Sequence, residues 1–390
     1  MRWIDFRKDD GAVAVLVAIL FSSLVIVGLL AIVVDGGSLY RERRVLQNAA
    51  DSATLANTRE CALETSNCSS NSFAAAYTNA NSPDSLSNVK ELCGLNQGVS
   101  TISLNTCTPI SVRPFACKNI GSTYPRFLRV IADTKTTSGT TINLPFGSAL
   151  GTQYSAGKKI EACAQAAWGK AKSAQVVFPI AFPACGFNST INTQIWHPIL
   201  SKNDVACSIT DIFGANFSFS GNLNGYTQIY DGGCPNEVTP RTYSVGDQIT
   251  TESSFIQLSS NPSTGCATLA EFISVVRPLI GKIIYVPVVG DITTGGIGNG
   301  KFKIIGFYAV KFLGAKFKNP GSASGAIFGS PPTCTPSDNC TSANYNWPSA
   351  CSNSGSCFYG KFSRGVVPGA DVDTDPNYPA LGAQAVQLLE

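Results

Sequence analysis

Two short segments contain residue types that could bind a phosphate or a metal ion. The first, GGIGNGK at residues 295–301, resembles a phosphate-binding loop, in which glycine N–H groups and a lysine contact the phosphates. The next residue, Phe302, lacks the hydroxyl that would hold magnesium. The flanking segments also predict two strands, whereas a phosphate-binding loop must open a helix. We therefore expect this segment to be the turn of a β-hairpin.

The second segment has aspartates with the spacing that opens a calcium-binding loop. These are Asp371, Asp373 and Asp375. Pro376 stands where such a loop needs glycine, and Gly382 stands where it needs a bidentate glutamate. The pattern argues against a calcium loop of this class and leaves a loose cation site as an open alternative. We expect neither a metal nor a cofactor in this protein.

Nucleophilic catalysis has equally little support in the sequence. The segment at residues 321–325, GSASG, has the outline of a nucleophile elbow but places Ala323 at the nucleophile. The single histidine, His197, lies between Trp196 and Pro198, and no acidic or serine motif accompanies it. We expect His197 to be structural, no residue to be catalytic, and the protein not to be an enzyme.

Cysteine is the most informative reactive residue type. All 14 cysteines follow residue 60, and no two of them are spaced as Cys-x-x-Cys, which argues against a structural zinc site. An even number of cysteines in a loop-rich region predicts disulfides in an oxidising compartment. The disulfide candidates are Cys61, Cys68, Cys93, Cys107, Cys117, Cys163, Cys185, Cys207, Cys234, Cys266, Cys334, Cys340, Cys351 and Cys357.

The element that places these cysteines is an uncharged apolar run at residues 12–34. At about 1.5 Å per residue it is long enough to cross the roughly 30 Å hydrocarbon core, so it predicts a transmembrane helix. A cleaved secretory signal would be shorter and would end in small residues. Three basic residues precede the run and three follow it, so charge does not orient it. The cysteines do, and they place residues 1–11 in the cytoplasm and the rest outside.

An amphipathic helix is predicted directly after this span, within residues 35–60. Residues 39–58 contain no glycine or proline, and small apolar residues recur at helical spacing. The stripe consists of Leu46, Ala49, Ala50, Ala53 and Ala56. A small-residue face lets another helix approach closely, so the stripe is a candidate partner interface. The alternative is that it packs on this protein's own outer region, and the sequence leaves both open.

The outer region is predicted to be a disulfide-rich, β-rich α+β structure. We expect a disulfide-containing subdomain at residues 61–170, with strands and loops up to residue 145. A β-rich subdomain follows at residues 171–370, and a C-terminal tail at 371–390. Within the second subdomain, spacing predicts a helix at residues 266–280 and strands at 282–289, 301–317 and 357–367. The fold class is thus one transmembrane helix, its amphipathic extension, and this extracellular region.

The N-terminal residues resemble a known family. GAVAVLVAIL at residues 11–20 and VVDGGSLYRERRVLQNAADSATLA at residues 33–56 are similar to the N-terminal segment of the Tad/Flp pilus-assembly TadE/TadG-like proteins. The shared features are a glycine, a membrane helix, a Val-Asp-x-Gly turn, a basic step and Leu-Gln-x-Ala-Ala-Asp-x-Ala. Here that motif contains Gln47, Asn48 and Asp51. Later stretches, KIIYVPVV, IIGFYAVKF and CFYGKF, resemble cysteine-containing members from Gram-positive bacteria more weakly.

The resemblance implies a non-enzymatic, membrane-anchored component of Tad/Flp pilus assembly or surface attachment. Expected partners are other pilus-assembly membrane proteins or pilins, with lipid around residues 12–34. The location implied is the bacterial cytoplasmic membrane. Nucleic acid is excluded as a partner because 28 basic against 25 acidic residues give a net charge of only +3. The oligomeric state stays open.

Two alternative functions are kept. One is a membrane-anchored cell-surface hydrolase with an unrecognised site. The other is a minor pilin that is cut after Gly11 and enters the fibre. Family members cut by prepilin peptidase have a glutamate shortly after the cleavage glycine, where this chain has Val15 and Leu16. The resemblance therefore predicts that residues 1–11 are retained.

Overall fold

The structure is a computed structural model, and it describes part of the chain. That part comprises residues 10–22, 28–29, 31–82, 86–98, 102–109, 117, 120, 123–136, 139, 141–146, 157–177, 180–184, 194–198, 206–213, 215–220, 227–230, 240–252, 276–294, 301–316, 326–328 and 357–389.

The N-terminal part is helical. Helix α1 spans Asp10–Ser22, a short π-helical turn spans Ala31–Asp35, and α3 follows it directly as Gly36–Ala62. The amphipathic helix predicted for residues 39–58 is confirmed and extends beyond both predicted ends. With 27 residues, α3 is about 40 Å long. No helix among the residues described is both long and apolar enough to span a lipid bilayer.

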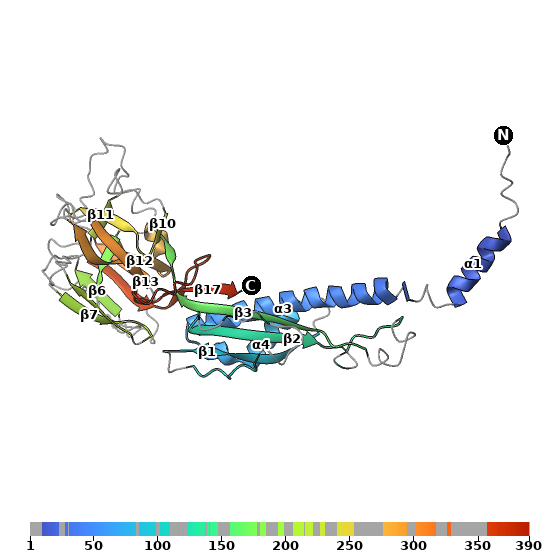
Figure 1. Cartoon of the computed structure of the whole chain (residues 1–390). Helices are drawn as coiled ribbons and strands as arrows, with labels where there is room; N and C mark the ends of the chain where they lie inside the picture. The colour runs from blue at the N-terminus through green and yellow to red at the C-terminus, as the bar shows by residue number, and fades with distance from the viewer. Residues whose placement is uncertain are drawn as a thin grey trace, which may run out of the picture.

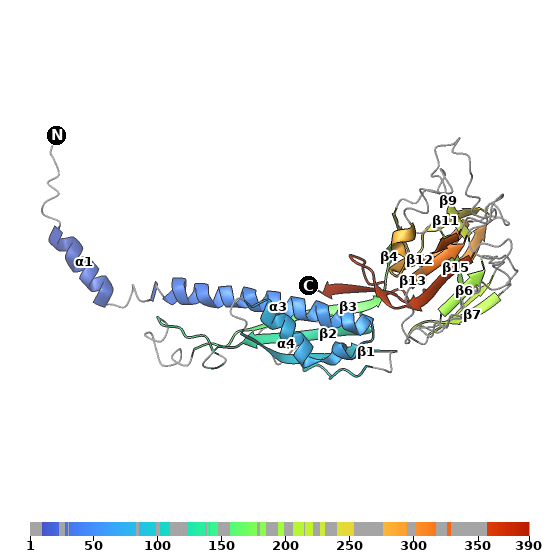
Figure 2. The ribbon, with the colours of Figure 1, turned by 180° about the vertical axis from the view of Figure 1, so that it is seen from behind.

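The first sheet lies along α3, with its strands in the order β1-β2-β3-β17-β16. All neighbours pair in antiparallel fashion except β16 and β17, which are parallel. Helices α3 and α4 pack together on one face of the sheet (Figure 1, Figure 2). The strand bounds are Ser87–Asn96 (β1), Arg126–Thr134 (β2), Glu161–Lys170 (β3), Ala383–Leu389 (β17) and Gly365–Val366 (β16).

Two parts of this layer differ from the sequence expectation. Residues 61–145 were expected to contain only strands and loops, but they include α4 (Asn71–Ala80) and a 3-10 turn at Ser66–Ser69. The hydroxyl of Ser70 accepts a hydrogen bond from the Phe73 N–H at 3.2 Å, which caps α4 ahead of its alanines. The region expected to be a C-terminal tail contains β17, which pairs with β3 along six residues.

The second sheet lies beyond the C-terminal end of α3 (Figure 1). Its strand order is β11-β9-β5-β12-β13-β15-β6, and β14 pairs with β13. The long β12–β13 hairpin confirms the strands predicted at residues 282–289 and 301–317. The bounds are Gln248–Glu252 (β11), Thr227–Tyr230 (β9), Ile180–Pro183 (β5), Ile283–Thr294 (β12), Lys301–Lys316 (β13), Cys357–Ser363 (β15), Gln194–Pro198 (β6) and Ala326–Phe328 (β14).

Two further predicted elements have mixed outcomes. The strand predicted at residues 357–367 is divided at Arg364, so β15 joins the second sheet whereas β16 joins the first. Of the helix predicted at residues 266–280, only the end is described, where Arg277–Leu279 form a 3-10 turn.

Two small antiparallel pairs of strands are also described. They are β4 (Ser173–Val176) with β10 (Arg241–Ser244), and β7 (Ala206–Thr210) with β8 (Asn216–Ser220).

One apolar cluster joins the two sheets, so they share a core. Ala383 and Ala385 of β17 belong to the same buried cluster as Ile304 and Phe307 of β13. A bridge between Tyr308 and Gly382 continues the backbone contact from one sheet to the other. The two sheets are therefore packed on each other rather than tethered by a linker.

Three disulfides are present in the described part, and all lie in the half of the molecule that carries α3. They are Cys61–Cys68, Cys93–Cys107 and Cys117–Cys163. They confirm the disulfide prediction for these six cysteines. Of the other candidates, Cys207 lies in β7 and Cys357 is the first residue of β15, and the side chains of both are outside the description. The remaining candidates lie outside the described residues.

Candidate functional site

The strongest candidate site is the junction at which α3 is fixed to the first sheet. Leu46, Ala49, Ala50 and Ala53 have no solvent exposure, and Ala56 is half-buried. Leu46 and Ala50 pack against short side chains of β2 and β3, namely Ala132, Ala162 and Ala164. Because both surfaces carry small residues, the helix comes close to the sheet and Leu46 fills the space between them.

The C-terminal half of α3 is buried in a larger apolar cluster. Ala53 packs there with Trp168 of β3, which is 2% exposed, and with residues of α4, β1 and β2. The other buried members are Cys61, Ala62, Cys68, Ala74, Leu92, Leu128 and Val130. The stripe considered as a partner interface is therefore occupied by this chain's own sheet and α4. Its buried members have no surface left for another helix, and internal packing is the alternative that the structure favours.

The polar residues of the Leu-Gln-x-Ala-Ala-Asp motif fasten the helix from the side. The Gln47 amide donates to the main-chain oxygen of Cys163 at 3.0 Å and to the Asp51 carboxylate at 2.8 Å. Asp51, one turn further along α3, thereby fixes the orientation of the Gln47 amide. Cys163 also forms the disulfide with Cys117. The motif thus joins α3 to the strand that is itself tied to the loop bearing Cys117.

Asn57 holds the C-terminal end of α3 by hydrogen bonds, a role that was not predicted from the sequence. Its side-chain amide is fully buried and donates to the main-chain oxygens of Asn67, Cys68 and Ser70 at 3.0 to 3.3 Å. These three carbonyls belong to the turn that leads from α3 to α4. The signal was available, because Asn57 lies at helical spacing between Ala53 and Cys61, where an apolar residue would be expected.

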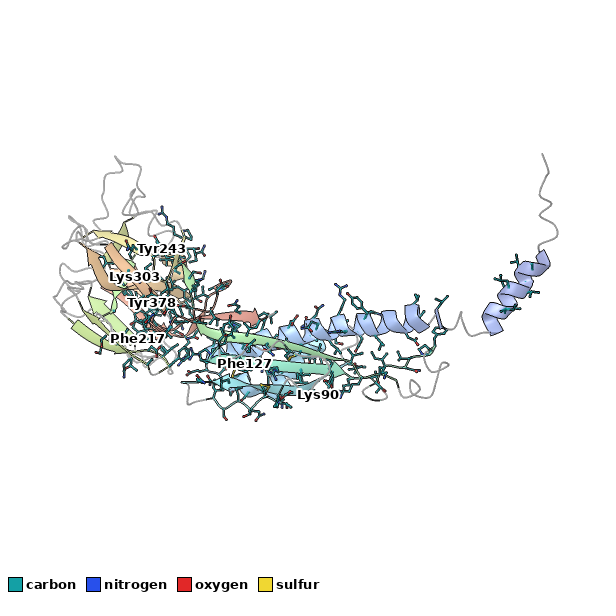
Figure 3. The ribbon with its side chains drawn as sticks, viewed as in Figure 1. Lys90, Phe127, Phe217, Tyr243, Lys303 and Tyr378 are labelled. Atoms are coloured by element: carbon teal, nitrogen blue, oxygen red, sulfur yellow. A yellow bond between two sulfur atoms is a disulfide. The ribbon has the colours of Figure 1, made fainter. Side chains whose placement is uncertain are left out.

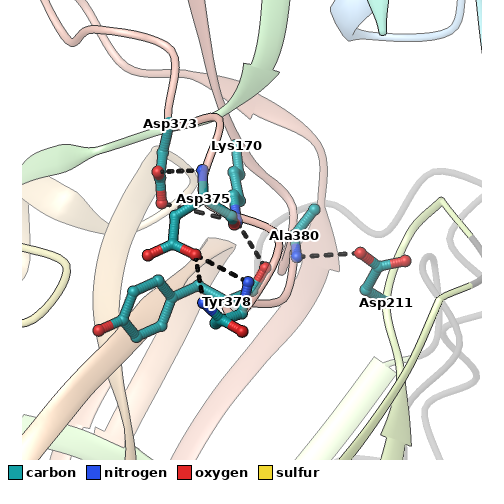
Figure 4. Close-up of polar contacts among 7 residues, drawn as sticks. Lys170, Asp211, Asp373, Asp375, Tyr378 and Ala380 are labelled. Atoms are coloured by element: carbon teal, nitrogen blue, oxygen red, sulfur yellow. Dashed lines mark hydrogen bonds and ion pairs between the residues drawn. The ribbon is translucent and has the colours of Figure 1, made fainter.

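A polar joint lies at the opposite end of β3, where the two sheets meet. The Lys170 ammonium donates to the main-chain oxygen of Tyr378 at 2.6 Å and to that of Asp375, and forms an ion pair with Asp373 at 3.6 Å (Figure 4). Burial lowers the pKa of Lys170, and the charges of Asp373 and Asp375 partly oppose that shift. The Lys170 and Lys303 nitrogens lie 5.7 and 5.0 Å from the centroid of the Tyr378 ring, and Figure 3 labels Tyr378 and Lys303.

This joint explains the aspartates that resembled a calcium loop. A lysine ammonium lies where a loose cation would have been held. Asp373 accepts a hydrogen bond from the Asp375 N–H at 2.9 Å, and Asp375 accepts from the Asn377 N–H at 2.9 Å. The carboxylates are thus used within the loop and for Lys170. Asp371 lies in the same loop, and its main-chain oxygen accepts from the Lys172 N–H at 3.0 Å.

The turn between β7 and β8 completes the joint. The Asp211 carboxylate accepts from the N–H groups of Phe213 and Ala215, both at 2.9 Å, and from that of Ala380 at 3.2 Å. The Arg126 guanidinium of β2 stacks 3.4 Å from the Phe213 ring centroid. Burial lowers the pKa of Arg126, against the opposing effect of Asp211. Arg126 of the first sheet thus contacts the β7–β8 turn, and Asp211 of that turn accepts a hydrogen bond from the loop between β16 and β17.

The remaining sequence candidates are not brought together. His197 lies in β6 opposite Phe358, without a described side chain. Of the glycine-rich segment, only Lys301 is described, as the first residue of β13, and residues 321–325 lie outside the described part. Within the residues that the structure places, no group of three or more histidine, cysteine or acidic side chains is arranged to hold a metal.

Comparison with known proteins identifies the segment that forms the junction. Residues 11–56 match the family model described as "Putative Flp pilus-assembly TadE/G-like". Neither the comparison with curated proteins nor that with solved structures found a match. The matched residues include all of α1 except Asp10 and most of α3, including Gln47 and Asp51. Residues 11–56 are thus similar to the TadE/G-like Flp pilus-assembly family, which agrees with the resemblance of their motif.

Proposed function

We propose that this protein is a membrane-anchored, non-enzymatic component of Tad/Flp pilus assembly. Residues 12–34 cross the cytoplasmic membrane once, residues 1–11 lie in the cytoplasm, and the two-sheet region is extracellular. Partners are other pilus-assembly membrane proteins or pilins. The family match to residues 11–56 supports the pilus-related role.

One observation carries the proposal. The family segment begins with an exposed apolar helix and ends in a helix that is buried in the folded outer region. At its start, large apolar side chains are exposed, including Val13 (61%), Leu16 (58%), Ile19 (58%) and Leu29 (58%). The described side chains of this stretch thus form an exposed apolar surface, which suits apolar surroundings. At its end, Leu46 and its neighbours are fully buried in the outer region. This arrangement suits a protein that holds an outer region at the membrane.

The disulfides support the proposed orientation. Cys61–Cys68, Cys93–Cys107 and Cys117–Cys163 all follow the apolar run. Disulfides persist in oxidising compartments and are rare in a reducing cytosol. This supports placing residues 61–163 on the outer side of the membrane.

Deletion of the gene in the native host tests the role. The proposal predicts that surface pili, counted by electron microscopy, are lost or strongly reduced, and that an intact copy of the gene restores them. Normal numbers of functional pili in the deletion strain would refute a role in assembly. A strain lacking a known pilin provides the reference for complete loss.

A further inference from the structure

We infer that the first turns of α3 bind the headgroups of anionic phospholipids at the outer membrane surface, through Arg41 and Arg44 with Tyr40 beside them. The inference rests on the proposed function, because it takes residues 12–34 as the membrane span. It adds the ligand that the same segment meets where it leaves the bilayer.

The exposed side chains along this stretch change character in a fixed order. Val33 and Val34 are 69% and 41% exposed, and Tyr40 is 65% exposed. Arg41 and Arg44 follow, and both are exposed. A bilayer presents hydrocarbon, then an interface favoured by tyrosine, then phosphates. The order of side chains along the helix therefore matches the order of layers across one membrane leaflet.

The distance along the helix also fits. The turn at Ala31–Asp35 runs directly into α3, and Arg41 is seven residues beyond Val34, or about 10 Å along the axis. The headgroup layer on each side of the hydrocarbon is roughly 5 to 8 Å thick. An arginine side chain can extend back toward that layer while its stem stays on the helix. Arg44 is about 15 Å beyond Val34, but its guanidinium lies back beside Tyr40, so both guanidinium groups can extend toward the phosphates.

The exposed face of these turns is basic. Of the two acidic side chains of the stretch, Asp35 is 5% exposed and Glu42 is half-buried, so both are less exposed than Arg41 and Arg44. The Arg44 guanidinium lies 5.8 Å from the centroid of the Tyr40 ring, a cation–π distance. Full burial in α3 begins only at Leu46, so the sheet does not cover this face.

These properties select anionic phospholipid over zwitterionic lipid. A guanidinium pairs well with a phosphate oxygen pair, and a headgroup without its own ammonium leaves that phosphate free to accept. Each arginine near the surface raises the affinity for an anionic bilayer by up to about fivefold at low salt, and the effect declines beyond a Debye length. Two arginines are therefore enough to give a measurable lipid preference.

The test uses the full chain reconstituted in phosphatidylcholine vesicles. Electron spin resonance gives the association of spin-labelled phosphatidylglycerol relative to spin-labelled phosphatidylcholine at the protein surface. We expect the wild-type chain to favour phosphatidylglycerol by about threefold or more at low salt. The double variant Arg41→Gln/Arg44→Gln should bring the ratio close to one. The matched control is Arg59→Gln, since Arg59 is an exposed arginine on the same helix, with a side chain that is 61% exposed.

The outcomes separate this inference from the proposed function. The inference is overturned if the wild-type chain shows no preference, if the double variant keeps it, or if Arg59→Gln removes it equally. Flotation of the same vesicles is measured first. A chain that does not float with lipid refutes the membrane anchor and this inference together. A chain that floats without preferring phosphatidylglycerol refutes the headgroup site alone.

Discussion

The burial of Leu46 makes a sharp prediction about what the small-residue stripe does. Leu46 has no exposure, and the side chains around it, Ala50, Ala132, Ala162 and Ala164, are too short to move into a cavity. Leucine-to-alanine changes at such sites cost about 3 to 5 kcal/mol, and most where the surroundings cannot collapse. We therefore expect Leu46→Ala to destabilise the junction by about 3 to 4 kcal/mol.

The same substitution at Leu55 is the matched control. Leu55 lies on the same helix, but 38% of its surface is exposed, so Leu55→Ala should cost only about 1 kcal/mol. Hydrogen exchange over α3 is measured by mass spectrometry on the full chain in detergent. The exchange rate reports the free energy of local opening of the helix. Leu46→Ala should accelerate exchange about a hundredfold or more, and Leu55→Ala less than tenfold. Equal effects would show that Leu46 is not packed internally and would return the stripe to the partner-interface hypothesis.

Three further predictions concern the joint, a buried tyrosine and the disulfides. Lys170→Met leaves the Asp373 carboxylate, which is 10% exposed, without its cation. Chemical denaturation should therefore show a free energy of unfolding lower by about 3 kcal/mol. Adding Asp373→Asn should recover part of that loss, and no recovery would argue against the ion pair. Burial raises the pKa of Tyr308 above its usual 10.0, so the unfolded chain releases that proton first and stability should fall as the pH rises above 10. Tyr308→Phe should reduce this fall by up to about 1.4 kcal/mol per pH unit, and denaturation curves at pH 9 and 11 that are unaffected by the change would contradict it. Cys61, Cys68 and the other four paired cysteines should resist alkylation until a reductant is added, and free thiols in the purified protein would oppose the extracellular orientation.

The sequence was sufficient to predict local elements but not their partners. The periodicity of residues 39–58 predicted α3, a continuous β-branched run predicted β12, and partial alternation of apolar residues predicted β13. Whether the alanines of α3 would face a foreign helix or this chain's own sheet could not be read from the stripe. A stripe of small side chains can pack against a helix of another protein or against a sheet of the same chain. Here it packs against Ala132, Ala162 and Ala164, which lie about a hundred residues away in sequence.

Long-range pairing explains the other differences. β17 was missed because Ala383 to Leu389 has little β-branched character, and its pairing with β3 joins residues more than two hundred positions apart. The aspartates at 371–375 were judged only from residues near them in sequence, whereas their role is set by Lys170, which is about two hundred residues away. α4 was missed because its serine- and asparagine-rich start reads as a loop until Ser70 is recognised as a cap.

The most direct test of the account is to separate the outer region from its anchor in the native host. In a strain that lacks the gene, residues 35–390 are expressed behind a cleavable secretion signal, and surface pili are counted against a strain carrying the intact gene. We expect the released region to be secreted and disulfide-bonded but not to restore pili, whereas the intact protein restores them. Normal piliation with the unanchored region would contradict the claim that this protein acts in assembly as a membrane-anchored component.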